Sequence, residues 1–264
     1  MSEQLAKKIR EHALLMTHKA KASHIGSCLS MADLLAVLYK DILRVKPSKP
    51  DWADRDRFIL SKGHGAAILY AVLAERGFFK KEELKTFYQV GSRLAGMTNF
   101  NVPGVEISTG SLGHGLPIGC GMALVGKKKG KKYRIFVLLG DGELNEGSNW
   151  EAMLFAAHHK LDNLVIIVDC NGLQALGETK NIINLDSLEK KFEAFNWSAV
   201  SVDGHNHNEI KIALTNIPIE NGKPSVIVAY TVKGKGISFM EKKPEWHYKS
   251  LNDKELSKAL DEIK

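Results

Sequence analysis

The chain has 264 residues, of which 44% are apolar and 25% are charged, and its net charge is +7. This composition is that of an ordinary globular protein with enough apolar residues for a buried core. No apolar run reaches the roughly 18 residues that a membrane span needs, and the polar N-terminus lacks a signal-peptide pattern, so we expect a cytoplasmic protein with no membrane partner.

Two further features narrow the class of protein. The densest basic run, residues 127–132, has no aromatic side chains for stacking on bases, so we do not expect nucleic-acid binding. The three cysteines, Cys28, Cys120 and Cys170, are too far apart for a close-spaced metal site. We therefore expect reduced thiols, mostly buried.

In the first part of the chain, apolar spacing predicts mainly helices. The predicted elements are a helix at 3–22, a helix at Met31–Leu43 with Ser30 as a possible cap, a strand at 57–61, a helix from Ala66 and a helix at 80–90. Residues 91–110, rich in Gly, Asn, Ser and Pro, are predicted to be a long loop, and long ordered loops in compact domains tend to be functional.

The rest of the chain alternates apolar strands with helices. The predicted elements are helices at 118–125, 148–159 and 209–215, and strands at 133–139, 164–169, 199–202 and 225–231. The strands at 133–139 and 164–169 are apolar on both faces. This pattern predicts an α/β fold: a single domain, 1–264, with a mostly parallel sheet covered by helices on both faces.

Two polar residues follow these two strands. Asp141, within Gly140-Asp141-Gly142, comes after the first strand, and Asn171 comes after the second. A right-handed strand–helix–strand unit brings both strand ends to one edge of the sheet, where ligands of such sheets bind. A carboxylate, an amide oxygen and a nearby carbonyl form a hard oxygen site for Mg²⁺ or Ca²⁺. The glycines beside Asp141 let the backbone approach a bulky anion.

The segment from Gly140 to Asn171 resembles the thiamine diphosphate motif, and its wider wording, Gly-Asp-Gly-Glu-Leu-Asn-Glu-Gly-Ser-Asn-Trp-Glu-Ala-Met, is similar to transketolases in particular. The resemblance covers essentially the whole chain. It implies that Asp141, Asn171 and the carbonyl of Leu173 hold Mg²⁺ (or Ca²⁺ or Mn²⁺), which bridges to the diphosphate of the cofactor. It also implies that Glu146 and Glu151 lie near a subunit interface, and that Glu146 is close to the cofactor as well.

The resemblance assigns further site residues. It implies that His24, His64 and His247 line the route to the reactive carbon and handle protons of substrate hydroxyls, a role that suits imidazole near neutral pH. His64 and His247 are also expected to contact the cofactor. The other implied cofactor contacts are Ser27, Lys62, Gly110, Ser111, Leu112, Gly140, Gly142 and Lys233.

The sequence departs from the transketolase pattern at two places. Met97 stands where transketolases commonly have a histidine that contacts the donor sugar, and a thioether cannot replace that hydrogen bond. Either the donor differs, or Asn99 or Asn101 substitutes. His24 lacks the usual preceding glycine and following proline, a milder change.

The remaining histidines are expected to be structural. His158 and His159, on the helix at 148–159, are interpreted as packing or surface groups. For His205 and His207, in a turn before a helix, capping or loop packing is expected rather than catalysis.

The chain ends soon after His247, whereas transketolases continue with pyrimidine-binding and C-terminal domains. The resemblance therefore implies a split transketolase, α2β2 with a C-terminal partner subunit, moving a two-carbon ketol unit between sugars. Three alternatives stay open: a transketolase-like enzyme of specialised metabolism with an unusual donor, the alpha subunit of a 2-oxoacid dehydrogenase, or a non-catalytic cofactor-binding subunit. A dinucleotide enzyme is not expected, because Gly119-Cys120-Gly121 is only a fragment of that fingerprint.

Overall fold

A computed structural model describes all 264 residues. Five parallel strands form one sheet in the order β1-β2-β3-β7-β6. The strands are β1 (Arg57–Leu60), β2 (Ile135–Gly140), β3 (Leu164–Cys170), β6 (Ser198–Asp203) and β7 (Ser225–Tyr230). The parallel α/β sheet expected from the sequence is confirmed.

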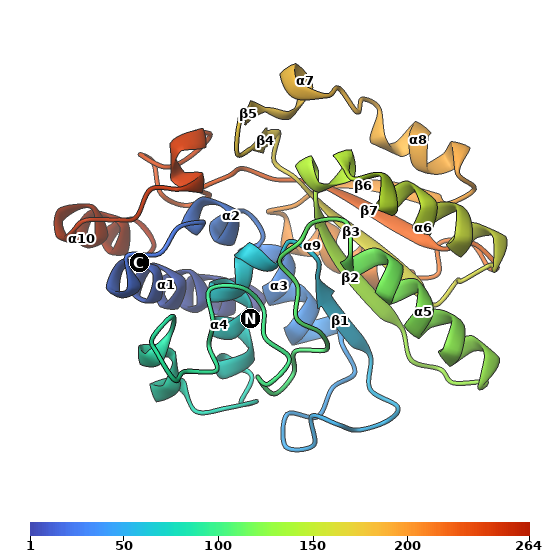
Figure 1. Cartoon of the computed structure of the whole chain (residues 1–264), viewed down its shortest axis with the longest axis horizontal. Helices are drawn as coiled ribbons and strands as arrows, with labels where there is room; N and C mark the ends of the chain where they lie inside the picture. Colours follow the sequence, from blue (N-terminus) through green and yellow to red (C-terminus); the bar gives the residue numbers. More distant parts are fainter.

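Helices cover both faces of the sheet (Figure 1). One face carries α1 (Ser2–Ala20), α2 (Ile25–Ser30), α3 (Ala32–Val37), α4 (Ala66–Glu75) and α9 (His207–Thr215). The other carries α5 (Gly115–Lys128), α6 (Gly147–His158) and α8 (Leu188–Ala194). Successive strand residues alternate between the two cores: Phe136 and Leu138 pack on the first, Ile135 and Val137 on the second. Residues 135–139 of β2 and 164–168 of β3 are all apolar because both faces of these strands are buried.

Several predicted helices differ in extent. The helix expected at Met31–Leu43 with a Ser30 cap is wrong in detail: α2 already starts at Ile25, Met31 separates it from α3, and a π-helical turn, η1 (Leu38–Ile42), follows. Ser30 is the last residue of α2, and its hydroxyl donates to Asp169 instead of capping a helix. The helix expected at 80–90 is a shorter 3₁₀ helix, η3 (Lys81–Thr86).

The helix expected at 118–125 runs from Gly115 to Lys128. Small residues let this helix lie close to the sheet: a Cβ at Gly119 would meet the side chain of Val137 at 2.7 Å. Short elements that the sequence did not predict are η2 (Gly63–Gly65), η4 (Gly142–Asn145), β4 (Leu173–Gln174), β5 (Gly177–Glu178), α7 (Thr179–Ile182), α8, η5 (Pro244–His247) and α10 (Asp253–Glu262). None of the helices has the length and apolarity needed to cross a membrane.

The carboxyl ends of four strands converge at one edge of the sheet. Lys62 follows β1, Asp141 follows β2, Asn171 follows β3 and Lys233 follows β7. These strands are neighbours in the sheet, so their loops meet although the residues span the chain. This edge contains the candidate site.

Candidate active site

A pocket at the carboxyl edge of the sheet brings together all of the predicted site residues except Ser111 and Glu146. The predicted residues that line it are His24, Ser27, Lys62, His64, Gly110, Leu112, Gly140, Asp141, Gly142, Asn171, Leu173, Lys233 and His247. Ser111 and Glu146 are exposed and outside the lining, as is Glu151 on α6. The part of each residue in binding remains a prediction.

Asp141 joins the ends of β2 and β3. Its carboxylate is almost fully buried and accepts hydrogen bonds from the backbone N–H of Gly142 at 2.9 Å and of Gly172 at 2.7 Å. Gly172 has φ +74°, a left-handed conformation that glycine adopts without strain. The Asn171 side chain in turn accepts from the N–H of Leu173 at 3.1 Å. Carboxylate, amide and following turn therefore form one hydrogen-bonded unit.

The donor set at this edge fits a hard divalent cation. Asp141, Asn171 and Leu173 line the pocket and supply carboxylate, amide and carbonyl oxygens, the ligands that Mg²⁺ prefers. Burial and the nearby charge of Asp169 raise the pKa of Asp141 to about 6, which indicates a carboxylate without a full counter-charge from the protein. A Mg²⁺ ion whose shell is completed by water and phosphate oxygens would supply that charge.

Two buried lysines lie in the same pocket. Lys62 forms an ion pair with Asp169, which also accepts from the hydroxyls of Ser30 and Thr231. Lys233 has only 1% of its surface exposed, and its ammonium contacts Nδ1 of His247 at 2.9 Å. Burial and the charge of Lys62 lower the pKa of Lys233 to about 8. Two ammonium groups, of which only Lys62 has a carboxylate partner, fit an anionic ligand such as a diphosphate.

The three predicted histidines form a cluster. The ring centroids of His24 lie 5.0 Å from those of both His64 and His247. Burial lowers the pKa of all three imidazoles, strongly for His64 and to about 3 for His247, and the neighbouring lysine charges add to the effect. All three are therefore neutral at pH 7, and each offers one donor and one acceptor.

The backbone fixes two of these histidines. His24 has φ +74°, and its N–H donates to the carbonyl of His247 at 2.9 Å, so the start of α2 is tied to η5. Because a protonated ammonium can only donate, Nδ1 of His247 must accept from Lys233, and the imidazole proton is on Nε2. His247 is thereby held in one tautomer with a free donor.

Several residues at the site were not predicted. Glu143, a buried residue of the pocket wall, accepts from the hydroxyl of Ser61 and from the N–H of Gly113 at 3.0 Å, so it ties the 110–115 segment to the end of β1. Asp169 holds Lys62 in place, and Tyr248 lines the pocket beside His247. The sequence could have indicated Asp169, because an acidic residue near the end of a fully apolar strand is buried and requires a cation nearby.

Met97 lies where the long loop reaches the histidine cluster. It lines the main pocket and an adjoining recess that it shares with His24, His64 and Tyr88. Asn99 and Asn101, the other candidates for the role of the missing histidine, do not line these pockets. The Asn99 amide donates to the carbonyl of Arg93 and accepts from Asn101.

The other histidines are distributed as expected, with one correction. His158 and His159 lie at the end of α6, near the surface. Neither His205 nor His207 caps α9: the cap is the Asn206 side chain. Both instead bond a buried carboxylate, Asp33.

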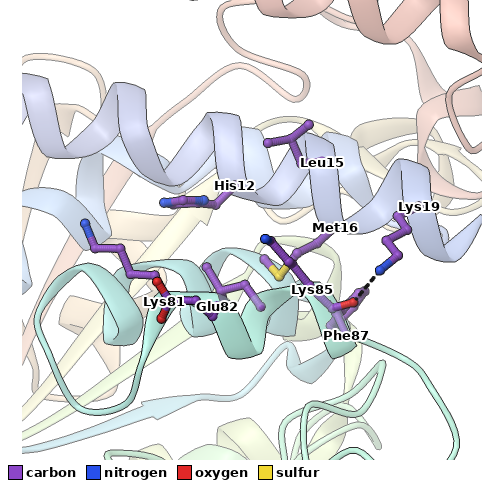
Figure 2. A pocket seen from close by; sticks show the side chains of 9 residues that line it. His12, Leu15, Met16, Lys19, Lys81, Glu82, Lys85 and Phe87 are labelled. Atoms are coloured by element: carbon purple, nitrogen blue, oxygen red, sulfur yellow. Dashed lines mark hydrogen bonds between the residues drawn. The ribbon is translucent and has the colours of Figure 1, made fainter.

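A separate pocket lies between α1 and η3, away from the sheet edge (Figure 2). It is lined by His12, Leu15, Met16, Lys19, Lys81, Glu82, Leu84, Lys85 and Phe87. Lys19 closes one end by donating to the carbonyl of Lys85 at 2.8 Å. None of the predicted site residues contributes to it.

The fold and the pocket define an α/β domain that carries an oxygen-donor cation site, buried lysines and neutral histidines at one sheet edge. Residues 1–263 match the family model described as transketolase, thiamine diphosphate binding domain. The chain belongs to the transketolase family, and the match favours it over a 2-oxoacid dehydrogenase subunit.

Individual relatives agree with the family match. The chain is 45% identical over 264 residues to one subunit of the apulose-4-phosphate transketolase of Actinobacillus succinogenes, covering 99% of this chain and 95% of that protein. It is 40% identical over 256 residues to a 6-deoxy-6-sulfo-D-fructose transketolase subunit of a Clostridium species, covering 97% and 93%. The crystal structure of Campylobacter jejuni transketolase aligns with a TM-score of 0.94 at 33% identity, covering 99% of this chain but 42% of that one.

Proposed function

We propose that this chain is the N-terminal subunit, 1–264, of a split transketolase that depends on thiamine diphosphate and Mg²⁺. The complete enzyme transfers a two-carbon ketol unit from a ketose donor to an aldose acceptor. One observation carries the proposal: a single pocket in which the Asp141–Asn171 unit lies with two buried lysines and three neutral histidines.

The cofactor-binding roles follow from charge and donor chemistry. Asp141, Asn171 and the carbonyl of Leu173 would hold Mg²⁺, with Ca²⁺ or Mn²⁺ as substitutes, and Lys62 and Lys233 would offset the diphosphate charge. When bound, thiamine diphosphate supplies the electron sink for the carbanion. Ser27, the glycines at 110, 140 and 142, and Leu112 would shape the walls around it.

The three histidines would handle protons. Because burial keeps His24, His64 and His247 neutral, each can accept a proton from a substrate hydroxyl or donate one to it. His247 presents its donor on Nε2, since Nδ1 accepts from Lys233. The protein thus positions substrate hydroxyls with uncharged groups next to a strongly charged diphosphate site.

Two comparisons support a partner chain. The relative in A. succinogenes is named as one subunit of its enzyme and is matched over 95% of its length, whereas the C. jejuni enzyme is matched over 42% of its chain. We infer that a separate C-terminal subunit carries the pyrimidine-binding and C-terminal domains, in an α2β2 assembly in the cytoplasm.

Reconstitution tests the split arrangement. This chain, its C-terminal partner and the mixture are each assayed for ketol transfer with thiamine diphosphate and Mg²⁺. We expect activity in the mixture alone. Full activity from this chain by itself would overturn the partner requirement, and release of CO₂ from pyruvate by the mixture would overturn the reaction class.

The donor is proposed to be unusual, which is the interpretation that Met97 favours. Met97 puts a thioether, in place of a hydrogen-bonding side chain, into the recess beside His24 and His64. Relatives at 45% and 40% identity are named for apulose 4-phosphate and 6-deoxy-6-sulfo-D-fructose. A screen of the reconstituted enzyme with branched, sulfonated and ordinary ketose donors tests this point. A preference for ordinary ketose phosphates would contradict it.

A further inference from the structure

Outside the pocket, three side chains surround the buried carboxylate of Asp33 and form a polar cluster with it. Arg10 of α1 donates two hydrogen bonds to this carboxylate, at 3.0 and 2.5 Å. His205 Nδ1 and His207 Nε2 contact its two oxygens at 2.8 and 3.0 Å. Asp33 is 6% exposed. Burial alone would raise the pKa of Asp33, but these hydrogen bonds hold it well below its usual range, so Asp33 is ionised and can only accept.

The hydrogen bonds of His205 fix its tautomer. The backbone N–H of Val232 donates to Nε2 of His205 at 2.9 Å, so that nitrogen has a lone pair. The imidazole proton must then be on Nδ1, where the carboxylate of Asp33 accepts it. Both partners require the same neutral tautomer, and a second proton on the ring would oppose the Val232 N–H. His205 therefore donates to Asp33 and accepts from the backbone amide of Val232, and so connects the two.

That amide immediately precedes Lys233. The segment from Thr231 to Gly234 follows β7 and is held by a series of backbone hydrogen bonds. The Thr231 N–H donates to the carbonyl of Cys170 at 3.0 Å and the Gly234 N–H to that of Gly26 at 3.0 Å. The carbonyls of Val232 and Lys233 accept from the N–H groups of Lys235 at 3.1 Å and Lys242 at 3.0 Å. His205 holds the N–H of Val232, directly beside the lysine that contacts His247.

The turn that carries His205 is built for this contact. A Cβ at Gly204 would lie 2.4 Å from the Thr231 side chain, so only glycine lets the turn approach the end of β7. The carboxylate of Asp203 accepts from the N–H of His205 at 2.8 Å and orients that residue. The turn Asp203-Gly204-His205 therefore places the His205 side chain against the end of β7, an arrangement that neither capping nor loop packing explains.

We propose that His205, held by Asp33 and Arg10, is a positioning residue that anchors the Val232 amide and so fixes Lys233 in the cofactor pocket. This rests on the proposed function in one respect, that Lys233 faces a diphosphate. The link resembles the carboxylate–histidine pairs that orient ligands from outside a binding site, whose loss costs roughly 10–100-fold in affinity or activity.

Two conservative variants separate positioning from packing. In His205→Gln the amide oxygen can occupy the place of Nε2 and accept from Val232, whereas the bond to Asp33 is lost. In His205→Asn the amide nitrogen can occupy the place of Nδ1 and donate to Asp33, whereas the acceptor for Val232 is lost. Hydrogen exchange at the Val232 amide and binding of inorganic diphosphate with Mg²⁺ are measured on the full chain, together with urea unfolding.

The expected pattern is a faster exchange at Val232 and roughly 10–100-fold weaker diphosphate binding in His205→Asn. His205→Gln should change less in both, because it keeps the acceptor for Val232 and loses only the contact with Asp33. A merely structural role predicts that both variants lose stability while exchange at Val232 and diphosphate binding do not separate them, and this result would overturn the proposal. If the wild type fails to bind diphosphate, the proposed function fails, and the exchange rates still decide whether His205 anchors Val232.

Discussion

The ammonium of Lys233 donates to Nδ1 of His247 at 2.9 Å, so one contact joins the charge expected beside the diphosphate to the imidazole expected beside the substrate. Both groups are shifted by burial, which lowers the pKa of Lys233 to about 8 and that of His247 to about 3. The pair therefore consists of a cation and a neutral ring at pH 7, and each partner can be tested separately.

Binding of thiamine diphosphate should weaken as the pH rises through about 8. Lys233 carries its charge below that pKa and loses it above, while an anionic ligand binds the protonated form more tightly. The other charged groups that act on Lys233 are Lys62, Asp141 and Asp169. Affinity of the reconstituted pair is measured from pH 7 to 9. In a Lys233→Met control, binding should be weaker at pH 7 and lose this dependence; equal slopes in both proteins would contradict the assignment.

Replacing His247 should slow the reaction more than it weakens cofactor binding. We expect His247→Phe to lower kcat of the reconstituted enzyme by about 10²–10⁴-fold, the usual contribution of a proton-handling side chain. Thiamine diphosphate affinity should change little, because His247 adds no charge. His158→Phe, on the exposed end of α6, serves as the matched control. An unchanged kcat would remove His247 from the catalytic set.

Met97 is predicted to act on donor choice alone. Introducing a hydrogen-bonding group in Met97→His should favour ordinary ketose phosphates by about 0.5–1.5 kcal/mol, the net worth of one hydrogen bond, or roughly 2–13-fold in relative kcat/KM. Met97→Leu keeps the apolar character and controls for shape. Steady-state kinetics with paired donors measures the ratio, and no change in the histidine variant would show that Met97 does not contact the donor.

The buried ion pair of Lys62 and Asp169 should be sensitive to the loss of either partner. Asp169→Asn leaves the Lys62 charge buried without its carboxylate, and we expect a loss of about 3–5 kcal/mol in the free energy of unfolding. The double variant Lys62→Met/Asp169→Asn should recover part of this loss, because it removes the unpaired charge. Urea unfolding measures both; a double variant less stable than the single one would contradict the account.

Much of the site was predictable from the sequence because strand ends in a parallel sheet meet by topology. Apolar strands ending at Gly140 and Cys170 were enough to bring Asp141 and Asn171 to one edge. The histidines and lysines required the family resemblance, since nothing in their local sequence indicates that residues 24, 64 and 247 converge. Glu146 and Ser111 are exposed and lie outside the pocket lining, so their roles stay predictions from the resemblance.

The features that sequence reasoning missed depend on long-range packing. Ser30 looked like a cap because serine commonly begins helices, but its hydroxyl is used by Asp169, 139 positions away. The bond between His205 and Asp33 spans 172 positions, so local spacing could not reveal it. Helix boundaries near Met31 and at η3 also depend on tertiary contacts that propensity does not report.

The most direct test of the central claim is Mg²⁺-dependent binding of thiamine diphosphate to the reconstituted pair, measured by calorimetry for the wild type and for Asp141→Asn. The Asp141 carboxylate is the only acidic group assigned to the metal. We therefore expect the affinity of the variant for thiamine diphosphate to fall by more than the roughly 100-fold that loss of a residue outside the metal's ligands can cost. Its unfolding transition should remain cooperative. Binding as tight as in the wild type, with the same dependence on Mg²⁺, would contradict the account.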